Sequence, residues 1–204
     1  KLTIYIMATN TQHSGSYLEL IIDPMFSGKT SRLIDIYKQC KFCNIPVVVV
    51  NHSVDNRYDE ELLSAHDQVK IPCIKTDALG YIWKEEPETN GMFKVLRDRE
   101  EIHFADVVLI NEGQFFEDLY DNVVSMLKHG KKVYVAGLDG DFQRHKFGQI
   151  LDLIPLCDNV IKLKSLCSIC KDGTAGIFSK RLTNETEQTI IGFSNYIPVR
   201  RKCY

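Results

Sequence analysis

A short stretch near the start of the chain combines residue types that bind phosphate. It lies between the apolar run 18–22 and a segment with helical spacing, and consists of Met25, Phe26, Ser27, Gly28, Lys29 and Thr30. A helix N-terminus offers unpaired N–H groups to phosphate oxygens. Glycine lets the backbone approach, lysine neutralises the β- and γ-phosphates, and a threonine hydroxyl ligates Mg²⁺. These residues predict an ATP-binding loop; the simpler interpretation is a strand-to-helix turn with a chance Gly-Lys-Thr.

The first position of this loop departs from the pattern G-x-x-x-x-G-K-[ST], because Asp23 stands in place of glycine. Pro24 biases residue 23 toward an extended conformation, which aspartate can adopt. The charge is harder to accommodate. A carboxylate ~4 Å from a phosphate oxygen costs up to ~4 kcal/mol at an effective dielectric constant near 20, and less if it turns to water. We expect Asp23 to lower the catalytic activity of the protein, because its charge opposes phosphate binding by this loop.

Polar residues follow the apolar run 107–110 directly. Ligands of open α/β sheets bind beyond the carboxyl ends of the strands. In P-loop proteins an aspartate at this place helps to hold Mg²⁺, whereas Asn111 accepts a hydrogen bond from a metal-bound water without adding charge. Glu112 is a candidate general base for a substrate hydroxyl that attacks the γ-phosphate. The alternative is a strand-capping glutamate exposed to water.

Aromatic residues gather after two neighbouring strand candidates. Phe115 follows Glu112, and Phe142 and Phe147 follow the apolar run that ends at Leu138. If these strand ends meet at one edge, the rings form a slot for a flat base near Glu112. The alternative is that they belong to the core, as most aromatic side chains do.

The C-terminal part contains a possible metal site. Cys167 and Cys170 have the spacing of a zinc knuckle, and Cys203 lies near the end of the chain. A fourth cysteine is expected at position 200, but Arg200 stands there and cannot ligate zinc. Three thiolates plus water remain one possibility, and three free thiols in a lobe without metal are the other.

The elements that position these groups alternate along the chain. Four apolar runs predict strands, and two segments with helical spacing predict helices. The strands are expected at 18–22, 47–50, 105–110 and 132–138, and the helices at 29–41 and around 119–127. This alternation predicts an α/β fold with a parallel sheet.

The chain of 204 residues is expected to divide into three parts. Residues 1–17 are a lead-in, 18–156 a P-loop ATP-binding α/β domain, and 157–204 a small, loop-rich lobe of the zinc-knuckle type. A net charge of −2 argues against nucleic-acid binding. No apolar run approaches the ~18 residues of a membrane span. Seven cysteines without a secretory signal favour the cytoplasm.

With these residues assembled, the chain resembles the type II, or cytosolic-class, thymidine kinases from about Leu18 to Tyr204. The resemblance rests on six motifs: PMFSGKT from Pro24, DNRY from Asp55, EGQFF from Glu112, LDGDFQR from Leu138, SKRL from Ser179 and YIPVRRKCY from Tyr196. It implies an ATP- and Mg²⁺-dependent kinase that phosphorylates the 5′-hydroxyl of thymidine or deoxyuridine. It also implies a structural Zn²⁺ in the small lobe.

The resemblance implies roles for individual residues. Lys29 and Thr30 match the phosphate and Mg²⁺ positions, Glu112 the general base, and Arg57 an arginine that reaches the phosphates. The pocket for deoxyribose and thymine would be lined by Met25, Phe115, Leu138, Phe142 and Phe147. A base-covering loop of the small lobe and its flank would include Ser179, Ile190, Gly192 and Tyr196. The family is usually a homotetramer inhibited by thymidine triphosphate.

Three departures from the family pattern leave a second hypothesis open. Asp23 replaces a glycine, Asn111 an aspartate and Arg200 a zinc-ligand cysteine. They affect the triphosphate, the Mg²⁺ and the small lobe, respectively. The alternative is therefore a catalytically impaired, nucleotide-binding relative. A different P-loop NTPase that hydrolyses ATP to drive a motion has little support, because we find no second NTPase signature.

Overall fold

The structure is a computed structural model that describes residues 15–55, 62–64, 69–83, 100–188 and 195–204. Its centre is a six-stranded sheet in which every neighbouring pair is parallel. The strands, in spatial order, are β5 (Ile74–Thr76), β2 (Val47–His52), β6 (Val107–Asn111), β7 (Lys132–Gly137), β1 (Tyr17–Ile22) and β8 (Asn159–Lys162). This is the predicted α/β architecture.

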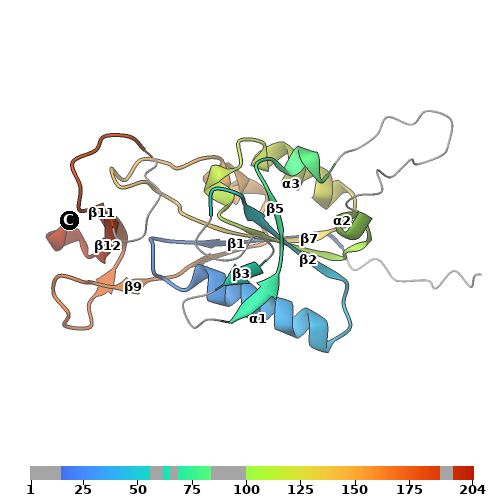
Figure 1. Ribbon diagram of the computed structural model, residues 1–204, viewed down its shortest axis with the longest axis horizontal. Helices are drawn as coiled ribbons and strands as arrows, with labels where there is room; N and C mark the ends of the chain where they lie inside the picture. Colours follow the sequence, from blue (N-terminus) through green and yellow to red (C-terminus); the bar gives the residue numbers. More distant parts are fainter. Residues whose placement is uncertain (1–14, 56–61, 65–68, 84–99, 189–194) are drawn as a thin grey trace, which may run out of the picture.

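Helices cover both faces of the sheet (Figure 1). Helix α1 (Lys29–Phe42) packs on one face, where Leu33 and Ile34 join Ile21 of β1 in a buried cluster. Helix α3 (Leu119–Lys128) packs on the other face, where Val123 contacts a cluster that includes Leu20. Adjacent residues of β1 thus serve opposite faces, because successive side chains of a strand alternate. Both helices were predicted from their spacing.

The remaining elements of the core are short. They are a hairpin of β3 (Leu62–Ser64) and β4 (Lys70–Pro72), helix α2 (Glu100–Phe104), and the 3₁₀ segments η1 (Leu79–Tyr81), η3 (Gly113–Phe115) and η4 (Ile150–Leu156). Segment η4 adds Ile150 and Leu153 to the cluster beneath α3. Within the described residues, no helix is long and apolar enough to cross a membrane.

Strand β8 differs from the sequence expectation. Its residues lie beyond the boundary predicted after residue 156, yet they pair with β1 at the edge of the central sheet. The burial pattern explains the difference, because three of its four side chains are exposed. An edge strand that faces water does not show the continuous apolar run of the inner strands.

The C-terminal lobe follows β8 and lies at one end of the molecule, at the left in Figure 1. It contains two small antiparallel pairs and a terminal 3₁₀ turn. These are β9 (Ser165–Leu166) with β10 (Ala175–Gly176), β11 (Phe178–Arg181) with β12 (Tyr196–Val199), and η6 (Arg201–Cys203). Among its described residues, the buried apolar side chains are Cys167, Tyr196, Pro198 and Val199. Apolar burial therefore contributes little to this lobe.

Candidate active site

The predicted phosphate loop connects β1 to α1. Gly28 caps the helix with φ of +89°, a left-handed conformation that glycine adopts without steric cost. The Lys29 ammonium folds back into the loop and donates hydrogen bonds to the carbonyls of Asp23 (2.9 Å) and Pro24 (2.7 Å). It also lies 3.3 Å from Ser27 Oγ. The structure thus places a cation within a loop that leads into a helix N-terminus.

Asp23 is the unusual member of this loop. Its φ of +157° is positive, whereas a following proline favours φ near −120°. The side chain is fully buried, and neither carboxylate oxygen has a hydrogen-bond partner among the residues that the structure describes. Burial, and secondarily Asp139, raises the pKa of Asp23 to about 7, although Lys162, Lys29 and Lys164 oppose the shift.

A chain of polar contacts links the loop to the ends of two neighbouring strands. Thr30 Oγ1 donates to Asn111 Oδ1 at 3.4 Å, and Asn111 Nδ2 donates to Asn51 Oδ1 at 2.9 Å. Asn51 in turn donates to Asp55 at 3.2 Å. Asn51 and Asn111 are register partners at the carboxyl ends of β2 and β6. The residues proposed to hold Mg²⁺ therefore meet, and Asn51 is a further member that the sequence did not reveal.

Glu112 is held in a defined position beside this chain. Its backbone is left-handed, with φ of 55° and ψ of 41°, a conformation that costs a non-glycine residue about 1–2 kcal/mol. The buried Gln114 amide donates to Glu112 Oε2 at 2.6 Å and accepts from the backbone N–H of Leu138 at 2.9 Å. Gln114 thus ties the carboxylate to the end of β7. Its place in the EGQFF motif was the available signal for this role.

The predicted aromatic cluster forms in part. The rings of Phe115 and Phe147 meet edge to face at 5.5 Å, and the His52 ring lies 5.6 Å from Phe115. Phe147 is buried, whereas Phe115 is half-buried, as are Met25, Leu138 and Phe142. Burial lowers the pKa of His52, which favours its neutral form. Partly exposed rings beside Glu112 are compatible with a slot for a flat ligand.

The C-terminal lobe contacts both the phosphate loop and the loop after β7. Ser179 Oγ on β11 accepts a hydrogen bond from the Met25 backbone N–H at 3.0 Å, which joins the lobe to the phosphate loop. Gln188 donates to the buried Asp141 carboxylate at 2.9 Å. Asp141 also accepts from the backbone N–H groups of residues 143 and 145. The segment before residue 189 is therefore anchored to the loop after β7.

Arg181 is the centre of a second anchor. Its buried guanidinium donates to the carbonyls of Glu185 (2.9 Å), Glu187 (2.6 Å) and Gln188 (3.1 Å), and to the Tyr196 hydroxyl (2.5 Å). It also lies 3.6 Å from the centroid of the Phe142 ring. The SKRL motif contained this residue, but its spacing did not indicate the role. The arrangement fixes residues 185–188 against β12 and the predicted pocket.

Three predicted site residues, Arg57, Ile190 and Gly192, lie outside the described residues. The described members of the base-covering loop and its flank, Ser179 and Tyr196, are both buried on the paired strands β11 and β12.

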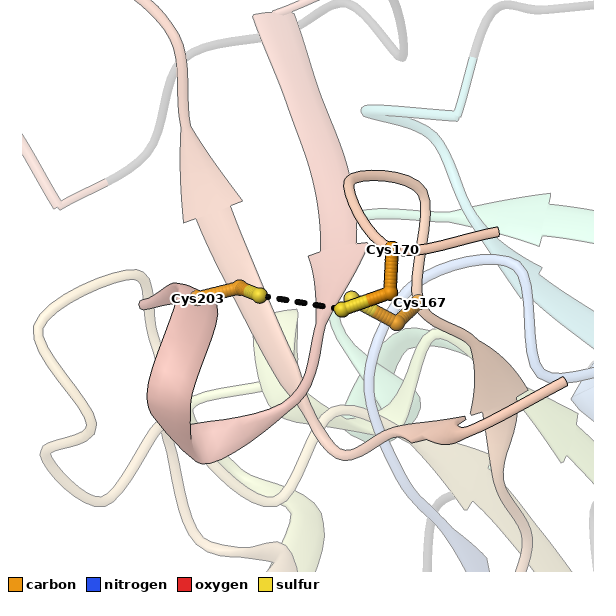
Figure 2. Close-up of side chains that lie close together, drawn as sticks. All are labelled: Cys167, Cys170 and Cys203. Carbon is orange, nitrogen blue, oxygen red and sulfur yellow. Dashed lines mark hydrogen bonds between the residues drawn. The ribbon is translucent and has the colours of Figure 1, made fainter. Parts of the chain in front are cut away.

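The three predicted cysteines do converge (Figure 2). The sulfur atoms of Cys167, Cys170 and Cys203 all lie within 4.8 Å of one another, and those of Cys170 and Cys203 are 3.2 Å apart. Hydrogen bonds from backbone N–H groups, of which that of Cys170 has the largest effect, lower the pKa of Cys167 to about 6. The hydrogen bond with Cys203 raises the pKa of Cys170 to about 12. Zn–S bonds of about 2.3 Å allow three sulfurs at this spacing to share one ion.

Arg200 lies beside this cluster. A hydrogen bond with the Cys203 side chain is the main cause that raises the pKa of the Arg200 guanidinium. Nη1 lies 3.7 Å from an Asp172 oxygen, while Nε is buried and has no hydrogen-bond partner in the described ranges. Among the described residues, the group holds three potential ligands and no fourth. The donors therefore fit a three-thiolate site, next to a cation that opposes a metal ion.

An all-parallel sheet with a strand–loop–helix unit that carries Gly-Lys-Thr defines the class of P-loop nucleotide-binding α/β proteins. The family model described as thymidine kinase matches residues 16–204. Similar proteins, each named thymidine kinase, occur in Myxoma virus strain Uriarra (40% identity), Vaccinia virus strain Western Reserve (39%) and Oryza sativa subsp. japonica (37%). The chain belongs to the thymidine kinase family.

These matches cover 93%, 94% and 92% of this chain, respectively. They also cover 97% of the Myxoma virus protein and 98% of the Vaccinia virus protein. The chain spans 65% of the length of the rice protein.

Proposed function

We propose that this protein is an ATP- and Mg²⁺-dependent thymidine kinase, which transfers the γ-phosphate of ATP to the 5′-hydroxyl of thymidine or deoxyuridine. The observation that carries the proposal is the position of Glu112. Gln114 holds its carboxylate at the sheet edge where Lys29 and Thr30 begin α1. A proton acceptor beside a phosphate loop is the arrangement that phosphoryl transfer to a hydroxyl needs.

In this proposal the phosphate loop binds the triphosphate. Lys29 turns from the carbonyls of its own loop to the β- and γ-phosphates, and Arg57 adds a second positive charge. Thr30 and Asn111 hold Mg²⁺, which supplies charge neutralisation when bound. Phosphate contacts also come from the loop backbone of Met25, Phe26, Ser27 and Gly28. Together these groups keep the γ-phosphate in line with the acceptor.

Glu112 takes the proton of the 5′-hydroxyl as that oxygen attacks phosphorus. Gln114 orients the carboxylate for this step by donating a hydrogen bond to Oε2. The nucleoside is oriented by the apolar and aromatic side chains of the proposed pocket, and a loop of the small lobe covers the base. The proposed pocket consists of Met25, Phe115, Leu138, Phe142 and Phe147, with Ser179, Ile190, Gly192 and Tyr196 in the loop and its flank.

The small lobe completes the proposal. Cys167, Cys170 and Cys203 hold a structural Zn²⁺ with three thiolates, and the ion stabilises the strands that carry the base-covering loop. We also propose that the chain divides into a P-loop domain and a small lobe, and that β8 belongs to the P-loop domain because it pairs with β1. A homotetramer inhibited by thymidine triphosphate follows from the family resemblance.

A catalytically impaired relative is the second candidate. The observation that favours it is the buried carboxyl of Asp23 within the loop that is proposed to receive the negatively charged phosphates of ATP. An ionised Asp23 opposes that ligand by Coulomb repulsion. Nucleoside binding without turnover is the expected property of such a protein.

A phosphate-transfer assay separates these candidates. Purified protein with Mg·ATP and thymidine is expected to form thymidine monophosphate. Glu112→Gln should lower kcat by roughly 10²- to 10⁴-fold, the usual contribution of a general base. Glu117→Gln, the same change at an exposed neighbour, is the matched control and should keep full activity.

Two outcomes contradict the proposal at different points. Unchanged turnover in Glu112→Gln shows that this carboxylate is not the base. No product from folded protein that binds thymidine favours the impaired relative. In that case Asp23→Gly combined with Asn111→Asp should switch activity on.

A further inference from the structure

The buried carboxyl of Asp23 has no function in the mechanism proposed above. It is 0% exposed, and within the described part of the chain both of its oxygens lack a hydrogen-bond partner. Burying an ionised carboxylate without partners costs several kcal/mol, so such groups shift toward the neutral form. The first position of the phosphate loop is therefore occupied by a buried group that can titrate.

The charged neighbours of Asp23 do not compensate this burial fully. Its electrostatic neighbours are Asp139, Lys162, Lys29 and Lys164. Lys162 already pairs with Asp139 at 2.6 Å, and the Lys29 ammonium donates to the main-chain carbonyls of residues 23 and 24 rather than to the carboxyl. The pKa of Asp23, raised to about 7, reflects this balance. Both protonation states are therefore populated near neutral pH.

ATP changes this balance in one direction. The triphosphate brings negative charge into the loop, and Lys29 turns from the Asp23 carbonyl toward the phosphates. Both changes penalise the ionised carboxylate by Coulomb interaction. We propose, on the basis of the function assigned above, that Asp23 is a proton-coupled gate for nucleotide: it takes up a proton from the buffer when ATP binds, so ATP affinity falls as pH rises.

The sign follows from linkage. At low pH Asp23 is neutral in the free protein, and ATP binds without moving a proton. Above the pKa of the free protein the carboxyl is ionised, and each bound ATP requires one proton to be taken up. Affinity is then expected to be flat at acidic pH and to fall by up to about tenfold per pH unit on the alkaline side.

Calorimetric titration with Mg·ATP in the absence of thymidine tests this coupling. Between about pH 6.5 and 8.5 the parent should lose roughly 25-fold in affinity, after the titration of ATP itself is subtracted. Asp23→Asn, which keeps the shape but cannot ionise, should lose nothing. Buffers of different ionisation enthalpy should show about one more proton taken up by the parent than by this variant at the higher pH.

Two further variants sharpen the test. Asp152→Asn removes an exposed carboxylate that pairs with Lys146, and should leave the pH profile of the parent unchanged. Asp139→Asn removes the anion that raises the pKa of Asp23 and releases Lys162, so it should move the midpoint to lower pH. Equal losses of affinity in the parent and in Asp23→Asn would overturn the proposal.

Different results would contradict the proton-coupled gate and the proposed kinase function. If neither protein binds ATP at either pH, the kinase assignment is wrong. The carboxyl can then be followed in the protein without nucleotide by the infrared band of a protonated carboxyl. This band should be present near pH 6 in the parent and missing in Asp23→Asn. A parent without that band overturns the titration of Asp23 whatever the function.

Discussion

Two regions form the proposed site, and they are held in place by different interactions. One is the core edge, the carboxyl ends of the central strands with the phosphate loop, and the other is the C-terminal lobe. At the core edge, Lys29, Asn111 and Glu112 stand at the ends of elements whose other residues fill two large apolar clusters. In the described part of the lobe, the buried apolar side chains are few, and the two antiparallel strand pairs are accompanied by the Arg181 hydrogen bonds and the cluster of three thiols. Positions in the core are thus set by packing, and positions in the lobe by a small number of polar contacts.

Each region also carries a departure from the family pattern, with opposite charge. Asp23 places an acid in the loop proposed to bind phosphate, and Arg200 places a cation where the lobe would receive a metal ion. The core accommodates its acid by burial, which shifts the pKa. The lobe leaves Arg200 partly exposed, where it pairs weakly with Asp172. The core thus changes the protonation of its acid, whereas the lobe leaves Arg200 partly exposed and keeps its charge beside the three thiols.

Among the variants that compare these two regions, the largest effect is expected from completing the metal site. Arg200→Cys adds a fourth thiolate and removes the opposing cation. If the 10–16 kcal/mol of a four-ligand zinc site is shared equally, one ligand contributes about 3 kcal/mol, or roughly 100-fold in zinc affinity. Competition with a chromophoric chelator measures this change, and thermal unfolding of the lobe should shift upward in parallel.

Lys128→Cys is the matched control, because it adds an exposed thiol on α3, far from the cluster in the fold. Its zinc affinity should equal that of the parent. An Arg200→Cys protein with unchanged zinc affinity contradicts the three-thiolate site.

A smaller effect is expected from releasing the lobe's main anchor. Arg181→Gln removes at least three hydrogen bonds to residues 185–188 and the stacking on Phe142. A loss of about 2 kcal/mol corresponds to a roughly 30-fold higher KM for thymidine. The affinity for ATP should change little, because the phosphate loop belongs to the core. Steady-state kinetics with each substrate varied separately resolves the two.

Arg201→Gln provides the comparison for this variant, since Arg201 is exposed and its guanidinium lies 5.0 Å from the Phe178 ring. It should leave both KM values near those of the parent. Equal increases for ATP and thymidine in Arg181→Gln indicate that this residue supports the whole fold rather than the loop.

The smallest effect is expected from a single methyl group in the core. In Gly137→Ala the new Cβ lies 2.5 Å from Gln114 Oε1 and 3.2 Å from the Gln114 backbone nitrogen. Gln114 must shift, and its hydrogen bond to Glu112 weakens. A misplaced base should lower kcat by about tenfold while KM for thymidine stays close to that of the parent.

Gly15→Ala is the control for this change, because its added Cβ has no atom within 4 Å. Its kcat should match the parent. If Gly137→Ala folds and keeps full kcat, Gln114 does not position Glu112.

The elements that could be predicted were those with strong local patterns. The apolar runs that form β1, β2, β6 and β7 were visible because inner parallel strands are buried on both faces. Strand β5 has three residues, and β8 is largely exposed, so neither has a pattern that separates it from a loop. The loop between β1 and α1 was predicted from residue type and spacing, because phosphate binding requires specific residues at adjacent positions.

The contacts that support the site could not be predicted in the same way. Gln114 and Arg181 lie within motifs, but their partners come from β7 and from residues 185–188 and Tyr196, which no local pattern connects to them. Asn51 became part of the site only through the pairing of β2 with β6. Long-range hydrogen bonds depend on the register and packing of whole elements rather than on neighbours in the chain.

The amino-acid sequence by itself determined the chemistry that this protein can offer: a lysine and a threonine at a helix start, a glutamate after a strand, and three thiols without a fourth. These follow from side-chain identity and spacing. The tertiary structure decided how Asp23 behaves, because its ionisation depends on burial and on charges from β8 and the loop after β7. Desolvation and Coulomb interaction act through space, so only the folded arrangement determines them.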